Sequence, residues 1–269
     1  MKLITTSLLV LALLAAALGT VAYNVMSRNV KQSGTLTVAQ EKMVTETRTV
    51  TRDIEQVEMN GPFDLDIVKS DKADLKIEGV DRLLPKVVVQ QDGKVLRITT
   101  KGMLVIMNQT PKITLSIPSL TVLTQDGSGD SEIKGFSGAT ITLNLNGSGN
   151  LFFSGQYQHV MAQSRSSGNI ELELAGSDQA DISLSGSGDI SVTGKVNRLL
   201  ANSTGSGDID AERLIALQTD AISHGSGNLK LYATRQVSVV STGTATIEIF
   251  GNPAKKNISN TGAGDVSVN

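Results

Sequence analysis

"STGSGDIDAE", residues Ser203–Glu212, contains a Gly-Ser-Gly-Asp sequence that recurs along the chain at a nearly constant spacing. A degenerate copy lies at 241–246, and "GAGD" closes the series at Asp265. An internal repeat of this length is typical of a solenoid, in which each repeat forms one coil and contacts its neighbours. The clear copies end 19 or 20 residues apart, at Asp130, Asn150, Asn169, Asp189, Asp208 and Asn228.

Each turn is followed by a short apolar alternation. Apolar residues occupy the first and third positions after the Asp or Asn in most copies, as in Ile190 and Val192. This period of two indicates a strand with one buried side, and no helical stripe of useful length interrupts it. The sequence therefore predicts a right-handed parallel β-helix, or β-solenoid, with 19–20-residue coils over residues 124–269. The first positions are expected to stack as one inward column: Leu151, Ile170, Ile190, Ile209 and Leu229.

In this fold the Gly-Ser-Gly-Asp copies are structural corners. We expect glycine there because the corner requires positive φ, which other residues adopt rarely. The Asp or Asn would bond either its own backbone or the turn of the next coil. A phosphate-binding loop is the alternative. Such a loop leads into a helix N-terminus, whereas each of these turns leads into a strand, so nucleotide binding is not expected.

Residues 51–123 have a different pattern. Alternating runs such as "FDLDIVKS" and "KVLRITT" predict strands, and "QDGK" (Gln91–Lys94) predicts a hairpin turn between two of them. We therefore expect a β-rich N-terminal part, mainly antiparallel or mixed, before the coils. Residues 28–50 are polar and rich in Thr, which indicates a tether.

Residues 1–27 form an export element. Lys2 precedes an uncharged run long enough to cross a bilayer, which takes about 20 residues, and Ala17-Leu18-Gly19 fits a signal-peptidase site. The segment is therefore either a cleaved signal peptide or an uncleaved transmembrane anchor helix. Both interpretations place residues 28–269 outside the cytoplasm, in the periplasm, in the cell envelope or anchored to the membrane. Contact with the membrane through residues 1–27 follows only if this segment is not cleaved.

The composition excludes several classes of function. The 269 residues include no Cys and two His, so disulfides, thiolate metal sites and Cys nucleophiles are excluded, and a His-rich metal site is not expected. The net charge of −2 argues against a nucleic-acid partner, which would require a basic face. Aromatic residues make up 3% of the chain, so aliphatic side chains must build the core.

Calcium deserves separate consideration, because repeated Gly-x-Asp turns bind it in nonapeptide solenoids. Here the period is about twice as long, and Asn replaces Asp in half of the clear copies. Asp189 and Asp208 would be the one pair of stacked acids on adjacent coils. The sequence therefore predicts no metal-binding residues, and no cofactor.

Catalysis on polysaccharides is the other possible chemistry, since carbohydrate-active β-helices use acids clustered with Arg or Lys. His159 and His224 each stand alone, and no Ser/His/Asp order is evident. We therefore predict no catalytic residues. The charged candidates for a cluster do not share one register: Asp181, Asp189, Asp208, Arg165, Arg198 and Arg213.

The turns and the upstream strands together resemble a bacterial family, the "putative auto-transporter adhesin, head GIN domain" family. The resemblance extends from about Thr51 to Asn269. It rests on the Gly-Ser-Gly-Asp/Asn turns, on "GPFDLDIVKSDKADLKIEGVDRLLPKVVVQQDGKVLRITT" (Gly61–Thr100) and on "ITLSIPSLTVLTQDGSGD" (Ile113–Asp130). It implies a secreted or envelope-attached β-solenoid.

Two functions follow from these observations. The first is an exported, envelope-associated, non-catalytic β-solenoid, an adhesin or structural protein that binds an envelope component, a glycan or a protein. The second is a polysaccharide-active β-helix enzyme, a lyase or hydrolase. Convergent acids and bases in a groove would favour the enzyme, whereas a ladder of Ser, Thr and Asn favours the binding protein. The sequence shows the ladder.

Overall fold

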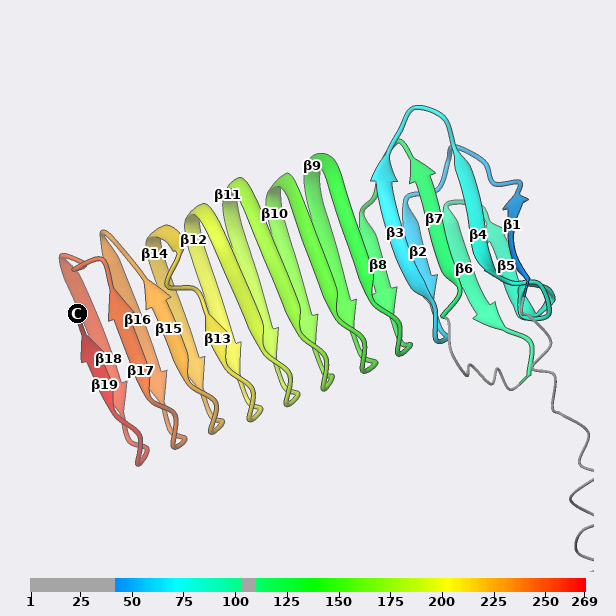
Figure 1. Cartoon of the computed structure of the whole chain (residues 1–269). Helices are drawn as coiled ribbons and strands as arrows, with labels where there is room; N and C mark the ends of the chain where they lie inside the picture. The colour runs from blue at the N-terminus through cyan, green and yellow to red at the C-terminus, as the bar shows by residue number, and fades with distance from the viewer. Residues whose placement is uncertain (1–41, 103–109) are drawn as a thin grey trace, which may run out of the picture. The chain divides into compact units, whose positions relative to one another are not determined.

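The computed structural model describes residues 42–102 and 110–269, which consist almost entirely of strands, turns and bends (Figure 1). Residues Met43–Asn269 form one compact unit. Within the described residues the one helical element is the short 3-10 helix η1 (Leu84–Lys86), which has Pro85 in its first turn. The export element expected at residues 1–27 lies outside the described residues.

A parallel β-solenoid begins at Ser131. Its first four coils are single long strands that bend in the middle, and its later coils consist of two shorter strands each. Neighbouring coils pair in parallel throughout, which confirms the predicted all-β solenoid. The strands are β9 (Ser131–Leu145), β10 (Leu151–Ser164), β11 (Ile170–Leu184), β12 (Ile190–Ser203), β13 (Ile209–Asp210), β14 (Leu214–Ser223), β15 (Leu229–Tyr232), β16 (Gln236–Ser241), β17 (Ile247–Phe250), β18 (Lys255–Asn260) and β19 (Val266–Val268).

Each coil crosses the unit twice, so the solenoid has two sheets. The first face contains the N-terminal halves of β9–β12, then β13, β15, β17 and β19. The second face contains the C-terminal halves of β9–β12, then β14, β16 and β18. The Gly-Ser-Gly turns lead from the second face back to the first, and we call this side the turn edge. We call the opposite side, where the long strands bend, the bend edge (Figure 1).

The strands before β9 continue both faces of the solenoid. On the first face, β3 (Asp64–Lys69) pairs with β9 and β7 (Lys112–Ile117), and β4 (Asp74–Val80) and β1 (Met43–Arg48) follow antiparallel. On the second face, β8 (Val122–Gln125) pairs with β9, and β2 (Gln56–Met59), β6 (Val95–Thr100) and β5 (Val87–Asp92) follow. The N-terminal part is therefore a mixed sheet, as the alternating runs predicted.

Two details differ from the expected division of the chain. Met43–Arg48, which we had placed in the polar tether, forms β1 and pairs with β4. The expected boundary after residue 123 falls inside β8, which joins β2 to β9 on the second face. The hairpin expected at Gln91–Lys94 is present, since β5 and β6 pair antiparallel around Gly93, which has a φ of 55°.

The core is mainly aliphatic, with Phe63, Phe136 and Phe153 also buried, and it is arranged in columns along the solenoid. The predicted inward column is confirmed, because its members are register partners in successive coils and each is at most 1% exposed. Burial of each such side chain stabilises the fold by roughly 1.5–3 kcal/mol. The column consists of Leu151, Ile170, Ile190, Ile209 and Leu229.

A second inward column, next to the turn edge, is partly polar. Ser203, Ser223 and Ser241 are register partners in three successive coils and are at most 1% exposed. Their hydroxyls form no hydrogen bond to any described residue. A buried hydroxyl without a partner costs free energy, so this column is a weak part of the core.

Candidate functional site

The turn edge carries a ladder of hydrogen bonds made by the Asp and Asn side chains. Asn169 Oδ1 accepts the backbone N–H of Asp189 at 2.9 Å, and Asp189 Oδ1 accepts that of Asp208 at 2.8 Å. The same bond recurs from Asp64 to Thr246. Of the two partners considered for these side chains, the next coil is therefore the one observed. Either Asp or Asn can occupy this position of the turn, because the bond needs only one side-chain acceptor oxygen.

The turn glycines are needed for a different reason from the one expected. We predicted positive φ at the corner, but none of the Gly-Ser-Gly glycines has a φ in the left-handed region. A Cβ added to Gly207 would instead lie 2.1 Å from the carbonyl oxygen of Gly188 in the preceding coil. Glycine is required because the backbones of neighbouring turns are in contact. Positive φ occurs at the bend edge, at Gly135, Gly176 and Gly194.

The ladder places Asp189 and Asp208 on adjacent coils, the pair for which calcium was considered. One oxygen of each carboxylate accepts a backbone N–H of the next coil. Among residues 42–102 and 110–269, no three His, Cys, Asp or Glu side chains gather into a group that could hold a metal ion. Because Ca²⁺ takes six to eight oxygen ligands, these two acids alone do not form such a site.

The residues considered for polysaccharide cleavage lie on different surfaces. Asp181 is on the second face, where its carboxylate contacts His159 Nε2 at 2.8 Å. Arg198 lies on the same face and pairs with Asp220 at 2.7 Å. Asp181 and Arg198 therefore lie on neighbouring strands of one face, where each pairs with a different residue, and Asp181 and Asp220 line the same pocket. The remaining candidates lie at the edges: Asp189, Asp208 and Arg165 at the turn edge and Arg213 near the bend edge.

The contact between His159 and Asp181 was missed by the sequence analysis. The register pairs His159 with Gln179 of the next coil, so Asp181 lies two positions further along the same outer face. The repeat period was the signal that could have found it. Both side chains are about one-third exposed, so the contact contributes little to stability. His224 has a polar neighbour as well, since its Nδ1 lies 2.6 Å from Thr242 Oγ1.

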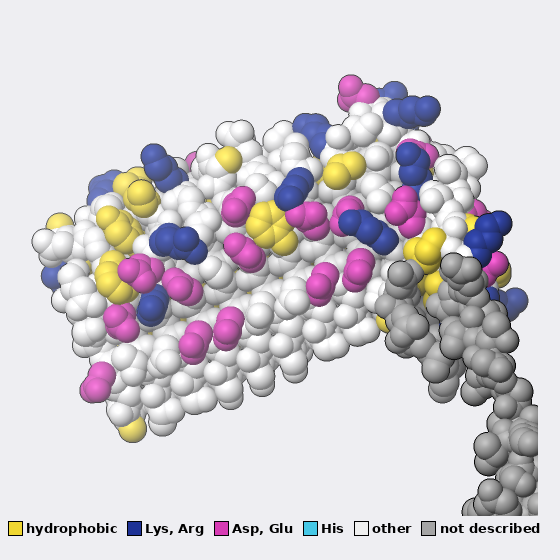
Figure 2. All heavy atoms as spheres, in the orientation of Figure 1, with side chains coloured by type: hydrophobic (Ala, Val, Ile, Leu, Met, Phe, Trp, Pro, Cys, Tyr) yellow, Lys and Arg dark blue, Asp and Glu magenta, His cyan; other side chains and the backbone are white. Residues whose placement is uncertain are grey.

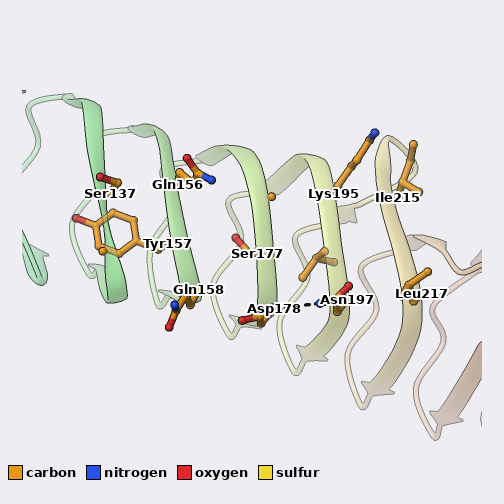
Figure 3. A pocket seen from close by; sticks show the side chains of 13 residues that line it. Ser137, Gln156, Tyr157, Gln158, Ser177, Asp178, Lys195, Asn197, Ile215 and Leu217 are labelled. Carbon is orange, nitrogen blue, oxygen red and sulfur yellow. Dashed lines mark hydrogen bonds between the residues drawn. The ribbon is translucent and has the colours of Figure 1, made fainter.

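A trough with a volume of about 630 Å³ runs along the bend edge, across five successive coils from β9 to β14 (Figure 3). Buried residues form its floor, and exposed residues form two rims. We call this feature the bend-edge trough. Its floor contains Tyr157, Ser177 and Val196. Its rims are Ser137, Gln156, Lys195 and Ile215 on one side, and Gln158, Asp178, Asn197 and Leu217 on the other.

The trough exists because the strands that cross the bend edge differ in length. β9 and β11 have 15 residues, whereas β10 and β12 have 14. The extra residue shifts the register between β10 and β11 after Gly155, so residues 156–158 have no register partner in β11. Such bulges bend the strands and interrupt the ladder. Gly176 leaves further space, because a Cβ there would meet nothing within 4 Å.

Tyr157 anchors the floor of the trough. Its hydroxyl donates a hydrogen bond to the carbonyl oxygen of Leu120 at 2.6 Å, and its ring lies 6.0 Å from that of Phe153. Burial raises the pKa of Tyr157 to about 12, so the hydroxyl stays protonated at neutral pH. A Cβ on Gly138 would lie 2.8 Å from the ring. Glycine at that position therefore makes room for Tyr157.

Charges of both signs are intermingled on the surface that Figure 2 shows. On the first face, Lys112 contacts Asp66 at 2.7 Å, and the hydrogen bond to this carboxylate is the main cause that raises the pKa of Lys112. The bend-edge trough is lined by one acid, Asp178, and one base, Lys195. The carboxylate of Asp178 accepts a hydrogen bond from the amide of Asn197 at 3.0 Å. The lining of the trough is therefore neutral overall.

These observations define a repeat protein of the parallel β-solenoid class, in which the acids of the repeated turns join the coils. A family model described as "Putative auto-transporter adhesin, head GIN domain" matches residues 53–253. The chain belongs to this family, which confirms the resemblance noted in its turns and upstream strands. No curated protein matches the sequence.

Solved structures of bacterial proteins share the fold. A "putative lipid binding protein" from Parabacteroides distasonis is 25% identical, with a TM-score of 0.77 over 86% of this chain and 98% of that one. A "putative adhesin" from Parabacteroides merdae is 19% identical, with a TM-score of 0.79 over 86% and 97%. A "putative adhesin" from Bacteroides fragilis is 22% identical, with a TM-score of 0.66 over 85% and 97%.

Proposed function

We propose that the chain is an exported, envelope-associated, non-catalytic β-solenoid of the adhesin type, which binds a surface component or partner through its outer surface. The observation that carries this proposal is the use of the repeated acids. Asp189 and Asp208 hold backbone amides of neighbouring coils, and Asp181 on another surface contacts His159. Glycosidases place two carboxylates about 5–9.5 Å apart on either side of the scissile bond. Membership of the adhesin family further supports binding over catalysis.

The export part of the proposal rests on the sequence of residues 1–27. Within the described residues there is no helix long and apolar enough to cross a membrane. The test is to produce the full chain in a bacterial host, to separate the cell fractions, and to measure the N-terminus of the product by mass spectrometry. Product in the periplasm or envelope is expected, and cleavage near Gly19 would identify a signal peptide rather than an anchor. Product confined to the cytoplasm would refute export.

The alternative, a polysaccharide lyase or hydrolase, predicts cleavage of a polysaccharide and not binding alone. The purified chain is incubated with a panel of envelope polysaccharides, and both binding and chain length are measured. Binding without any change in chain length is expected. Shortened products that disappear in the variant Asp181→Asn would favour the enzyme, because Asp181 is the candidate acid that has a titratable partner, His159, within 2.8 Å.

A further inference from the structure

We propose that the bend-edge trough is a binding site for a neutral oligosaccharide that lies across the coils. This inference deepens the proposed function and rests on it, because it assigns a ligand class to one surface of a binding protein. It starts from a concave feature of about 630 Å³ at one edge of the solenoid. Ligand sites are typically concave, with a few polar groups that fix the orientation of the ligand.

The side chains of the rims match the chemistry of a sugar. Gln156, Gln158 and Asn197 carry amides, each with two N–H donors and one carbonyl acceptor, and Ser137 carries a hydroxyl. All four residues are exposed and can reach a ligand in the trough (Figure 3). Sugar hydroxyls also donate and accept hydrogen bonds, so a lining of mixed donors and acceptors complements them. A purely anionic or cationic ligand would instead require groups of one charge.

The balance of charge selects a neutral ligand. The trough contains the carboxylate of Asp178 and the ammonium of Lys195, so neither sign dominates. The carboxylate of Asp178 also accepts a hydrogen bond from the amide of Asn197 in the next coil. Electrostatic complementarity suppresses binding of ligands with the wrong charge. A polyanionic or polycationic chain of the same length should therefore bind more weakly than a neutral one.

The geometry suits a chain of repeated units. Each rim presents one side chain from each of four coils, and neighbouring coils lie about 4.8 Å apart. Five coils therefore extend over about 19 Å. One rim follows Gln158, Asp178, Asn197 and Leu217 in successive coils. An oligosaccharide also repeats its polar groups at intervals of a single sugar ring, so several units can meet equivalent side chains.

An extended peptide is the competing occupant, and the pairing of the strands disfavours it. Peptides bind β-proteins chiefly by adding a strand to a free sheet edge. At the trough β10, β11 and β12 each pair with a strand on both sides, so the trough is not an edge. The irregular stretch at residues 156–158 is too short to receive a strand.

The test is calorimetric titration of the full chain, purified in a detergent without a sugar headgroup, with three soluble probes of equal length. The neutral probe is chitohexaose, the cationic probe is its deacetylated form, and the anionic probe is a galacturonate hexamer. Chitohexaose is expected to bind, and the charged probes are expected to bind at least about tenfold more weakly. No detectable binding of chitohexaose would overturn the proposal.

Variants then locate the site. Asn197→Ala removes an amide from the rim and should weaken chitohexaose binding about fivefold to tenfold, which corresponds to one or two hydrogen bonds. Asn202→Ala is the matched control, because Asn202 is an exposed Asn of the same strand that lies on the second face. Equal affinities of both variants and the parent would overturn the assignment to the trough while leaving a binding function in place. Cleavage of the probe would instead refute the proposed function.

Discussion

Replacing Gly207 by Ala tests why the turns contain glycine. The added Cβ would lie 2.1 Å from the carbonyl oxygen of Gly188, about 1.3 Å short of an ordinary contact of 3.4 Å. To relieve this overlap the two turns must separate. The separation would stretch the bond from Ser206 N–H to Gly186 O (3.1 Å) and the bond from Asp208 N–H to Asp189 Oδ1 (2.8 Å).

The expected loss of stability follows from these two effects. Overpacking a tight contact costs about 1–3 kcal/mol, and each hydrogen bond contributes about 1 kcal/mol. Gly207→Ala should therefore lower the free energy of unfolding by about 3–5 kcal/mol. For a unit of this size the melting temperature should fall by about 10 °C. Urea titration and thermal melting followed by circular dichroism both measure the change.

The variant Gly207→Asn distinguishes this steric explanation from an explanation based on the φ angle. If the turn required positive φ, Gly207→Asn would be better tolerated than Gly207→Ala, because Asn adopts the left-handed region more readily. With a backbone contact at the Cβ, both variants should be destabilised to a similar extent. Gly93 is the control, since its φ is 55° and a Cβ there would meet nothing within 4 Å. At Gly93, Asn should be tolerated better than Ala. The same preference at Gly207 would refute the steric explanation.

The other predictions concern the core and the ladder. Ile190→Asp buries a charge without a partner in the inward column and should cost roughly 4 kcal/mol or more; an unchanged urea midpoint would show that the column is not a core. Asp208→Asn should leave the melting temperature unchanged with Ca²⁺ and with chelator alike, because Asn keeps the acceptor for Asn228; a Ca²⁺-dependent rise confined to the parent would reveal a metal site. Ser223→Ala removes a buried hydroxyl without a protein partner and should stabilise the unit by about 1 kcal/mol; destabilisation would indicate that the hydroxyl is hydrogen-bonded in solution.

The coils could be predicted because the sequence contains two periods, the 19–20-residue spacing of the turns and the two-residue alternation of apolar side chains. The spacing of the turns defines the coil, and the alternation after each turn, as in Ile190 and Val192, defines the inward side. Burial of one side chain in every two is sufficient to set the register of a strand with one buried face. The inward column could therefore be named residue by residue before the structure was known.

The trough and the contact of the turns could not be predicted in the same way. Steps of 19 and 20 residues between turns are visible in the sequence, but they do not show where the extra residue is accommodated. The structure places it at the bend edge, where the register with β10 shifts before Gly155 in β9 and after Gly155 in β11. Glycine in a turn is compatible with positive φ and with close approach of another backbone. Only the position of the preceding coil distinguishes these two causes at Gly207.

Because of the ladder on the turn edge, the solenoid could gain or lose coils without a change in its cross-section. From Asp130 to Asn228, each turn offers the next coil the same acceptor that the preceding turn offers it, so removing the whole coil 189–207 would bring Asn169 Oδ1 to the amide of Asp208. Gain or loss of a complete repeat would then move the far end of the solenoid by about 4.8 Å. A solenoid of this design can thus change its length in increments of one coil.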